Sequence, residues 1–449
     1  MTHDATPADA VLEGARVAPP RERTWLGQPP GLAILFLTEM WEKFSFFGMR
    51  ALQVYYMTKA LHFDQARASL VYGTYAACVY LTPIVGGMVS DRWLGKRRAV
   101  IVGGALMALG HFMMASEALF FPAMAVIACG NGLFLPNLPS QVKPLYAAND
   151  ARLAGAYNLY YMGINLGAFI APLVCGTLGE VYGWHWGFGA AGVGMCLGLA
   201  IYVLGSRHLA PDDDVVDETP ADAASPASRH QLLFLVGTAL AVVIFRVAYE
   251  QTGNTLALWA DTAVDRRVFD WTIPVTWLQS LNPLFVFVMT PLLVAWWNRR
   301  GDARAPSAPL WKMSIGAMTV AASFVLLAVV ARVSDAGGVP AHWGWLVVFF
   351  ALLTLGELYI LPVGLGLFAQ LALPGFGATT IAAWFLAAFA GNLVSGVVGT
   401  WWSSMSPEGF YLAMAAIAAV SGTLLLMLAA AERRWFTDLM TAQRAGSPS

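Results

Sequence analysis

The stretch HLAPDDDVVDETPADAASPAS, residues 208–228, separates two long apolar regions of the chain. It is acidic, rich in Pro, Ala and Ser, and without apolar periodicity, which is typical of a flexible linker. The regions on either side are unusually apolar, since 58% of the 449 residues are hydrophobic and only 12% are charged. In a water-soluble domain about a quarter of the residues are charged. The composition therefore predicts an all-α integral membrane protein.

Apolar stretches long enough to cross about 30 Å of hydrocarbon occur in two sets, six on each side of the linker. They fall at 31–58, 67–90, 98–116, 118–146, 153–178 and 185–205, and then at 231–260, 271–297, 309–332, 342–370, 376–402 and 408–432. Six and six is the plan of two pseudo-symmetric helical bundles with a substrate site between them near the membrane midplane. We predict five segments: an N-terminal tail (1–30), a six-helix bundle (31–205), the linker (206–230), a second six-helix bundle (231–432) and a C-terminal tail (433–449).

The positions of the Lys and Arg residues predict the orientation, because cytoplasmic loops are enriched in both. Most of the 26 basic residues lie in loops and tails that share one side with the two termini, including a group at 92–98 and another at 299–312. Residues 1–30 also lack the apolar core of a signal peptide. We therefore expect a multi-pass protein of the plasma (inner) membrane with both termini in the cytoplasm.

Several functional classes are disfavoured by the sequence. A net charge of −1 argues against nucleic-acid binding, and the four cysteines form no CxxC pair of the kind that binds zinc. Neither a phosphate-binding GxxxxGKS/T loop nor a zinc-binding HExxH motif is present. We expect no enzyme activity and no cofactor other than protons. The expected partners are the lipid bilayer and a small-molecule or short-peptide substrate, bound by a monomer.

Seven ionisable side chains lie within spans 1, 7 and 10: Glu39, Glu42, Lys43, Arg50, Arg246, Glu250 and Glu357. Such a side chain is costly in a membrane unless it is paired or hydrated, so it marks a functional site by default. Glu39 precedes Lys43 by four residues, which is the favourable order for an ion pair on one helix face. Glu39 and Glu42 cannot both ionise easily one turn apart, so at least one is expected to bind a proton near neutral pH. Ion pairs that only lock the helices together are the alternative, but this number of charges favours a polar cavity.

Several motifs resemble those of one transporter family. The loop GGMVSDRWLGKRRAV (86–100) resembles the signature loop of the major facilitator superfamily. Within that superfamily, the chain resembles the proton-dependent oligopeptide transporter family at EMWEKFSFFGMR (39–50), YNLYYMGINLGAFIAP (157–172), YEQTGN (249–254), QSLNPLF (279–285), GELYILPVGL (356–365) and AAWFLAAFAGN (382–392). The resemblance implies a twelve-helix major facilitator fold that imports di- and tripeptides together with protons by alternating access.

The same resemblance implies roles for the matched residues. The amino terminus of the peptide would be held by Asn165, Asn282 and Glu357. The peptide carboxylate and side chains would be met by Lys43, Tyr75 and Trp384. The proton-coupling group would include Glu39, Glu42, Arg50 and Glu250, and we add Lys43 and Arg246 to it because they lie beside these acids in spans 1 and 7. Within that group, Glu250 would pair with Arg50 in an outer gate and would release it when protonated.

The chain departs from the family pattern at residues that would bind the peptide carboxylate. Lys43 stands where the family has an arginine, and Leu135, in GNGLFLPN (130–137), stands where it has a lysine. A lysine lacks the two-pronged hydrogen bonding of a guanidinium and a leucine lacks a charge, so carboxylate recognition is expected to weaken. A modified peptide, a peptide-like antibiotic or another carboxylate-poor solute is therefore the alternative substrate. A transport-dead sensor is a further alternative, which the short tails disfavour.

Arg246 is a second departure, because the family usually has a tryptophan at this position. It precedes Glu250 by one helical turn. We hypothesise that Arg246 supplies the cation that is missing at Leu135, either to Glu39 and Glu42 or to the substrate. A purely local pairing with Glu250 is the other interpretation of this spacing.

Overall fold

The computed structural model describes residues 24–147, 149–211, 229–300, 308–370 and 377–445. The long helices of the N-terminal half are α2 (Pro30–Lys59), α3 (Gln65–Val89), α4 (Lys96–Met113), α5 (Phe120–Phe134), α6 (Leu153–Ala171) and α7 (Trp184–Gly205). Those of the C-terminal half are α8 (Arg229–Tyr249), α9 (Thr255–Thr262), α10 (Leu281–Arg300), α11 (Ala308–Gly337), α12 (Gly344–Gln370), α13 (Gly377–Gly399) and α14 (Pro407–Ala445). Most of the predicted N-terminal tail and linker lie outside the described residues.

Short helical turns of tighter or wider pitch extend these helices or connect them. In the N-terminal half they are η1 (Ser90–Leu94), η2 (Glu117–Leu119), η3 (Pro139–Gln141), η4 (Lys143–Leu145), η5 (Pro172–Gly176), η6 (Leu178–Tyr182) and η7 (Ser206–His208). In the C-terminal half they are η8 (Glu250–Gly253), η9 (Val275–Ser280) and η11 (Thr400–Ser404). Because η8 joins α8 to α9, these three elements together form one span.

Ten helical segments of the described chain are long and apolar enough to cross a membrane. α2 and α4, with 30 and 18 residues, bring the number of long helical segments in the described residues to twelve, as the sequence predicts. These two helices are the more charged ones, since α2 contains Glu39, Glu42 and Lys43 and α4 begins with the basic run 96–98. α2 starts favourably because Pro30 occupies its first turn, where a missing N–H leaves no hydrogen bond unmade.

The predicted spans agree with the helices to within a few residues, except at the start of span 8 and the end of span 12. Span 8 does not begin at 271, because strand β3 (Trp271–Thr272) pairs antiparallel with β2 (Arg267–Val268) and η9 follows only after Pro274. The last helix continues to Ala445, so residues 433–445 of the predicted tail are helical. A further short ladder joins β1 (Val264–Asp265) in parallel to β4 (Ala341–His342). The all-α prediction therefore holds apart from four two-residue strands.

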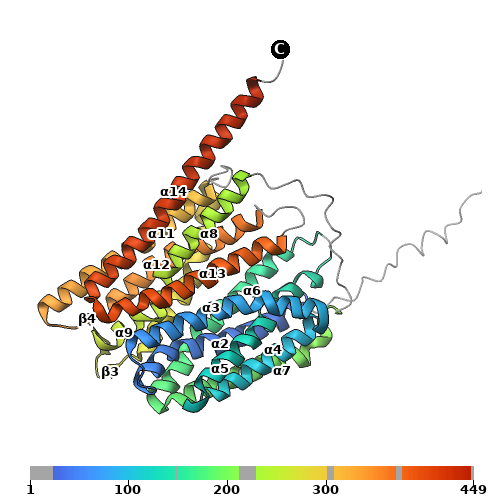
Figure 1. Cartoon of the computed structure of the whole chain (residues 1–449). Coiled ribbons are helices and arrows are strands. Elements are labelled where there is room, and N and C mark those ends of the chain that lie inside the picture. The colour runs from blue at the N-terminus through green and yellow to red at the C-terminus, as the bar shows by residue number, and fades with distance from the viewer. Residues whose placement is uncertain (1–23, 148, 212–228, 301–307, 371–376, 446–449) are drawn as a thin grey trace, which may run out of the picture.

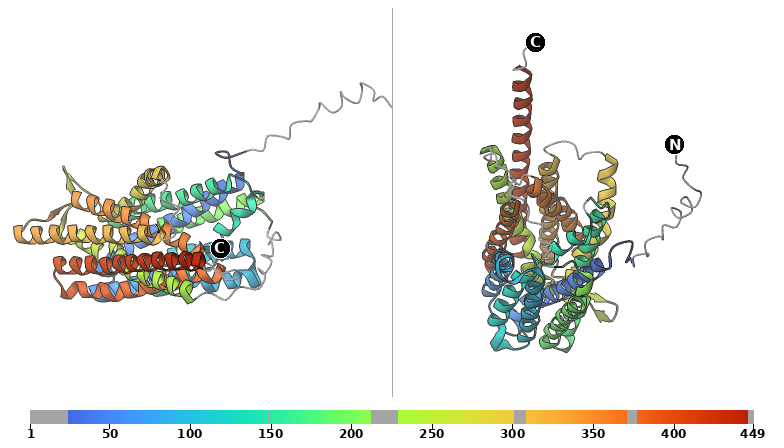
Figure 2. Two further views of the ribbon diagram at one scale, coloured as in Figure 1. Left: turned by 90° about the horizontal axis from the view of Figure 1, so that it is seen from above. Right: turned by 90° about the vertical axis from the view of Figure 1, so that its right-hand side faces the viewer.

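The two halves form a V (Figure 1). They converge at the end that carries β3 and β4, which we call the distal end. They spread apart toward the other end, where α7 ends and α8 begins, which we call the linker end. Figure 2 shows the molecule from two further directions, and in its right-hand view the last turns of α14 stand beyond the other helices. The substrate site predicted between the halves would therefore lie between the converging distal end and the diverging linker end.

The halves meet backbone to backbone where α3 crosses α13. Gly73 of α3 lies directly against Gly396 of α13, and a Cβ atom added to Gly396 would lie 3.0 Å from the Cα of Gly73. Glycine is needed here because no side chain fits between the two helices. The apolar core of the C-terminal half also takes in Val54 and Tyr55 from the distal part of α2. Packing between the halves is therefore tight at the distal end.

Polar contacts between the halves gather at the same end. Near the end of α2, the Tyr55 hydroxyl donates to the Ala257 carbonyl at 3.0 Å and the Lys59 ammonium lies 2.6 Å from an Asp261 oxygen. Further bonds join Gln65 to the carbonyl of Gly399 at 2.9 Å, Ser69 to Asn254 at 2.9 Å, Trp277 to Thr177 at 2.8 Å and Ser280 to the carbonyl of Phe169 at 2.8 Å. The structure is therefore the state in which the distal end is closed.

Candidate functional site

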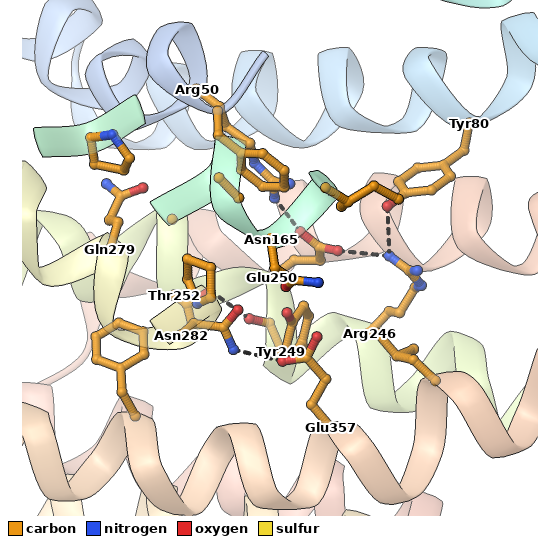
Figure 3. Close-up of a pocket in the computed structure, with 18 of the residues that line it drawn as sticks. Arg50, Tyr80, Asn165, Arg246, Tyr249, Glu250, Thr252, Gln279, Asn282 and Glu357 are labelled. Carbon is orange, nitrogen blue, oxygen red and sulfur yellow. Dashed lines mark hydrogen bonds and ion pairs between the residues drawn. The ribbon is translucent and has the colours of Figure 1, made fainter. Parts of the chain in front are cut away.

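A cavity of about 340 Å³ lies between the two halves (Figure 3). It is at the small end of the range of about 300–1,000 Å³ that is typical of ligand sites. Helices α2, α3 and α6 supply one wall and α8, α10 and α12 supply the other, so a solute inside it contacts both halves. Its charged residues are Arg50, Arg246, Glu250 and Glu357, and its other polar residues include Tyr72, Tyr80, Tyr161, Asn165, Tyr249, Gln279 and Asn282.

A break in the seventh span positions Glu250. The α-helix ends at Tyr249, tightens into η8 and is interrupted at Asn254, whose φ and ψ are −115° and −98°. Buried amides stabilise the break: Gln251 donates to the Ser395 carbonyl at 2.9 Å and accepts from Thr255 at 3.0 Å. Ser69 of the other half donates to Asn254 at 2.9 Å. Because these bonds come from α3 and α13, tertiary contacts hold the break and thereby the Glu250 carboxylate.

Glu250 lies between two arginines, one from each half. Its Oε2 pairs with Nη2 of Arg50 on α2, and its Oε1 lies 2.8 Å from Nη1 of Arg246 on α8. Arg50 is held in turn by a 2.8 Å hydrogen bond from its Nε to the Tyr72 hydroxyl. The pairing of Arg50 with Glu250 is the one that the family resemblance implies. It ties α2 directly to the C-terminal half.

A second acid, Glu357 of α12, lies on the same wall of the cavity as Glu250. Asn282 of α10 donates to Oε2 of Glu357 at 2.6 Å and to the Thr354 hydroxyl at 3.0 Å. Asn165 of α6 faces the same cavity and donates to the carbonyl of Tyr161 at 3.0 Å. The structure therefore brings together the three residues that the resemblance assigns to an amino group, with one carboxylate and two side-chain amides around the same space (Figure 3).

Three charged residues of the first span, Glu39, Glu42 and Lys43, lie outside this cavity, whereas Arg50 of the same helix lines it. The Lys43 ammonium lies 3.4 Å from an oxygen of Glu39 and 2.6 Å from an oxygen of Glu42, so the pairing expected from the spacing is present. Glu39 also accepts a 2.7 Å hydrogen bond from the hydroxyl of Tyr160. Lys43 does not line the cavity in this conformation. Its ammonium is engaged by the two acids on its own helix.

Two aromatic residues assigned to side-chain pockets also lie outside the cavity. Tyr75 is buried in the core of the N-terminal half, and Trp384 packs against Phe368 with ring centroids 5.3 Å apart. The tyrosines that α3 presents to the cavity are Tyr72 and Tyr80. At about 100° per residue, Tyr75 lies about 140° around the helix from Tyr80. The spacing of the tyrosines on α3 shows which of them share a face of that helix. It does not reveal which face of α3 packs against the C-terminal half.

The structure also bears on the hypothesis for Arg246. Its Nη1 donates to Glu250 and, at 3.4 Å, to the Tyr80 hydroxyl, and its guanidinium lies 4.8 Å from the Tyr80 ring centroid. In this conformation Arg246 contacts Glu250 and Tyr80, while the cation beside Glu39 and Glu42 is Lys43. The local pairing with Glu250 is present. Arg246 also lines the cavity, so its second expected role, toward the substrate, stays a prediction.

Comparison with known proteins assigns the chain to a family. The sequence profile of the POT family matches residues 97–221 and 214–411. The chain belongs to the POT family. A di-/tripeptide transporter of Lactococcus lactis subsp. cremoris is 30% identical to it over 91% of this chain and 96% of the relative. A peptide transporter of Yersinia enterocolitica subsp. palearctica is 32% identical over 85% of this chain and 89% of the relative.

A solved structure confirms the fold of this POT family member. The crystal structure of a POT peptide transporter in complex with sulfate superposes with a TM-score of 0.83 at 31% identity, over 91% of this chain and 96% of that one. The chain therefore has the predicted major facilitator fold and is a multi-pass membrane transporter. Within the part of this POT chain that the structure describes, no three His, Cys, Asp or Glu side chains come together as a metal site.

Proposed function

We propose that this protein is a proton-coupled symporter that imports di- and tripeptides and peptide-like solutes by alternating access. The observation that carries the proposal is the cavity between the halves, which is lined by Glu357 and two side-chain amides and also by two arginines. An acid with amides and a pair of cations around one cavity suit the ammonium and carboxylate ends of a short peptide. Two relatives that are 30% and 32% identical to this chain are named as di-/tripeptide and peptide transporters. We propose no enzyme activity and no cofactor other than protons.

The solute's amino group binds at Glu357. The carboxylate of Glu357 is oriented by the 2.6 Å hydrogen bond from Asn282. The side-chain oxygens of Asn282 and Asn165 can accept further N–H bonds from an ammonium group. Tyr161 and Tyr249 also line the cavity. Aromatic walls of this kind accept varied side chains with little specificity and attract a cation.

Proton uptake by Glu250 couples the proton to the movement of the halves. Ionised Glu250 holds Arg50, and with it α2, against the C-terminal half. A proton on Glu250 removes the charge from this tie, so the halves can separate at the distal end and admit solute there. An inward membrane potential contributes about 2.3 kcal/mol per charge for each 100 mV. That is enough to drive appreciable accumulation of the solute.

We also propose that the protein acts as a monomer in the plasma membrane with both termini in the cytoplasm. The support for this orientation is the enrichment of Lys and Arg on the side of the termini. In that orientation the distal end faces outward. The structure, with its distal end closed, is then the inward-facing state, and the gate formed by Arg50 and Glu250 is the outer gate.

Uptake into proteoliposomes tests the proposed function. We expect uptake of labelled dialanine to rise with an inward proton gradient, and we expect Glu250→Gln to reduce gradient-driven uptake to background, because an amide cannot take up the proton. Glu408→Gln is the matched control, since Glu408 is a more exposed acid whose ion pair, with Arg332, is 3.5 Å long. Wild-type uptake that is the same with and without the gradient would contradict proton coupling.

A carboxylate-poor solute is a second candidate substrate, and two observations favour it. Leu135 provides no charge at the end of α5, and the Lys43 ammonium is occupied by Glu39 and Glu42. Neither residue lines the cavity. If no other cation recognises an acid, dialanine and its methyl ester would bind equally well.

A further inference from the structure

The side chain of Arg246 is fixed in the wall of the cavity with part of its guanidinium unused. The side chain is only 6% exposed. Gly391 of α13 makes room for it, because a Cβ atom at Gly391 would lie 2.6 Å from the Cβ of Arg246. On its far side the guanidinium covers the ring of Tyr80 at 4.8 Å. The stem and the plane of the group are therefore both determined by neighbouring helices.

The hydrogen bonds of this guanidinium leave one edge without an acceptor. Nη1 makes the bonds to Glu250 and to Tyr80. Nε is buried and has no partner among the described residues. A buried N–H without an acceptor is unfavourable, and the edge formed by Nε and Nη2 is one that binds an oxyanion through two parallel hydrogen bonds. Among the described residues, the protein therefore leaves one buried N–H of this guanidinium unsatisfied.

Arg246 shares its paired carboxylate with another arginine. Arg50 and Arg246 both pair with Glu250. The other acid of the cavity, Glu357, accepts a hydrogen bond from Asn282. When Glu250 takes up a proton, both guanidinium groups therefore lose the carboxylate with which they pair. An acidic group of the solute would then take the place of the Glu250 carboxylate between the two arginines.

We propose that Arg246 determines substrate specificity: with Arg50 it forms a paired-arginine site for the acidic group of the solute, and it favours solutes that carry a doubly charged acid such as a phosphonate. The inference rests on the proposed transport function and specifies its substrate class. A phosphonate has three oxygens and up to two charges, so it can engage both guanidinium groups at once, whereas a carboxylate offers two oxygens and one charge. A methyl ester offers no charge.

Binding of three dipeptides to the purified protein in detergent tests this site. They are dialanine, its methyl ester, and the analogue with a phosphonate in place of the terminal carboxylate. We expect the wild-type protein to bind the phosphonate most tightly and the ester most weakly. We expect Arg246→Gln to weaken binding of the two acids by about tenfold or more, the effect of losing a charge-assisted hydrogen bond, and to leave the ester within about twofold.

Two further variants complete the test. Arg246→Lys keeps the charge but lacks the two-pronged edge, so it should retain dialanine binding better than Arg246→Gln and should lose the preference for the phosphonate. Arg332→Gln, which removes an exposed arginine whose partner Glu408 lies 3.5 Å away, should change none of the three affinities. Melting temperatures of all variants in detergent show whether each is folded.

The outcomes separate this inference from the proposed function. Equal weakening of all three ligands by Arg246→Gln would overturn the inference and would leave Arg246 as a partner of Glu250 alone. Equal binding of dialanine and its methyl ester by the wild-type protein would also overturn it, even if Arg246→Gln does not fold, and would favour the carboxylate-poor substrate. A wild-type protein that neither binds nor transports dialanine would instead contradict the proposed function itself.

Discussion

Two glutamates on α2 that lie one turn apart have different surroundings. Glu39 accepts a hydrogen bond from Tyr160 at 2.7 Å and lies 3.4 Å from the Lys43 ammonium. Glu42 is fully buried, lies 2.6 Å from Lys43 through Oε2, and finds no hydrogen-bond donor for Oε1 in the part of the chain that the structure describes. A buried carboxylate oxygen without a donor disfavours the charged form. The proton that the sequence assigns to one of these two acids is therefore expected on Glu42.

Substitution of each glutamate by glutamine tests this assignment. We expect Glu42→Gln to reduce gradient-driven uptake about tenfold or more while exchange of labelled for unlabelled dipeptide, which needs no net proton movement, continues. Glu39→Gln should retain gradient-driven uptake and should lower thermal stability by about 1 kcal/mol, since it weakens the pairing with Lys43. The reverse pattern, with coupling lost only in Glu39→Gln, would assign the proton to Glu39.

At the scale of residues, the sequence predicts pairs within one helix better than contacts between helices. The pairing of Glu39 with Lys43 and of Arg246 with Glu250 follows from a spacing of four residues. The choice of Tyr75 instead of Tyr72 and Tyr80 does not follow from spacing, because the cavity-facing side of α3 depends on how it packs against the opposite half.

Among the short elements, η9 is held by a carboxylate from the opposite half. Glu180 of η6 accepts hydrogen bonds from the backbone N–H groups of Val275 and Thr276 at 3.0 and 2.9 Å, and from the Thr276 hydroxyl at 2.6 Å. These are the first residues of η9, where the N–H groups have no partner within the helix. Glu180 thus joins the two halves at the distal end independently of Glu250.

We expect Glu180→Gln to shift the protein toward a state with an open distal end. The substitution replaces charge-assisted hydrogen bonds by weaker ones, so the closed state should lose about 1–3 kcal/mol. Spin labels at the exposed positions Ser116 and Ser404, one in each half near this end, report the opening as a longer distance in pulsed electron resonance. Glu117→Gln, at an exposed glutamate, is the control. An unchanged distance distribution in Glu180→Gln would show that the hydrogen bonds between Glu180 and η9 do not hold the distal end closed.

At the scale of elements, the existence of the twelve helices can be predicted from the sequence and their interruptions cannot. Apolar length alone locates the spans, because only a helix satisfies its own backbone in lipid. The break at Glu250–Asn254 has no local signal of comparable strength. It is stabilised by Ser69 and Ser395, which come from α3 and α13 and are far away in sequence.

For the whole molecule, the plan of six helices and six is visible in the sequence, but the closed distal end is not. An alternating-access transporter has two packings of the same chain that differ by only a few kcal/mol, so apolar patterns are shared by both. What identifies this state is a set of contacts between the halves, including the close approach of Gly73 and Gly396.

Adding one methyl group at this crossing should open the distal end. In Gly396→Ala the new Cβ would lie 3.0 Å from the Cα of Gly73 and 3.1 Å from the carbonyl oxygen of Ser69, both backbone atoms that cannot rotate away. We expect a loss of about 1–3 kcal/mol for the closed state, seen with the same spin labels as a larger long-distance population. Gly189→Ala is the control because a Cβ atom there meets nothing within 4 Å. A distance distribution identical to that of the wild type would show that α3 and α13 can accommodate the methyl group without opening the distal end.

The one-sided seal between the halves also determines from which compartment a blocker can act. A bulky peptide mimic that wedges between the diverging helices reaches its target from the aqueous phase at the linker end, where α7 ends and α8 begins. The same compound supplied at the distal end meets the close contact between Gly73 and Gly396 and the ion pair between Lys59 and Asp261 instead. Inhibition by such compounds would therefore depend on the membrane face to which they are added, and potency measured on inverted vesicles would differ from potency measured on intact cells.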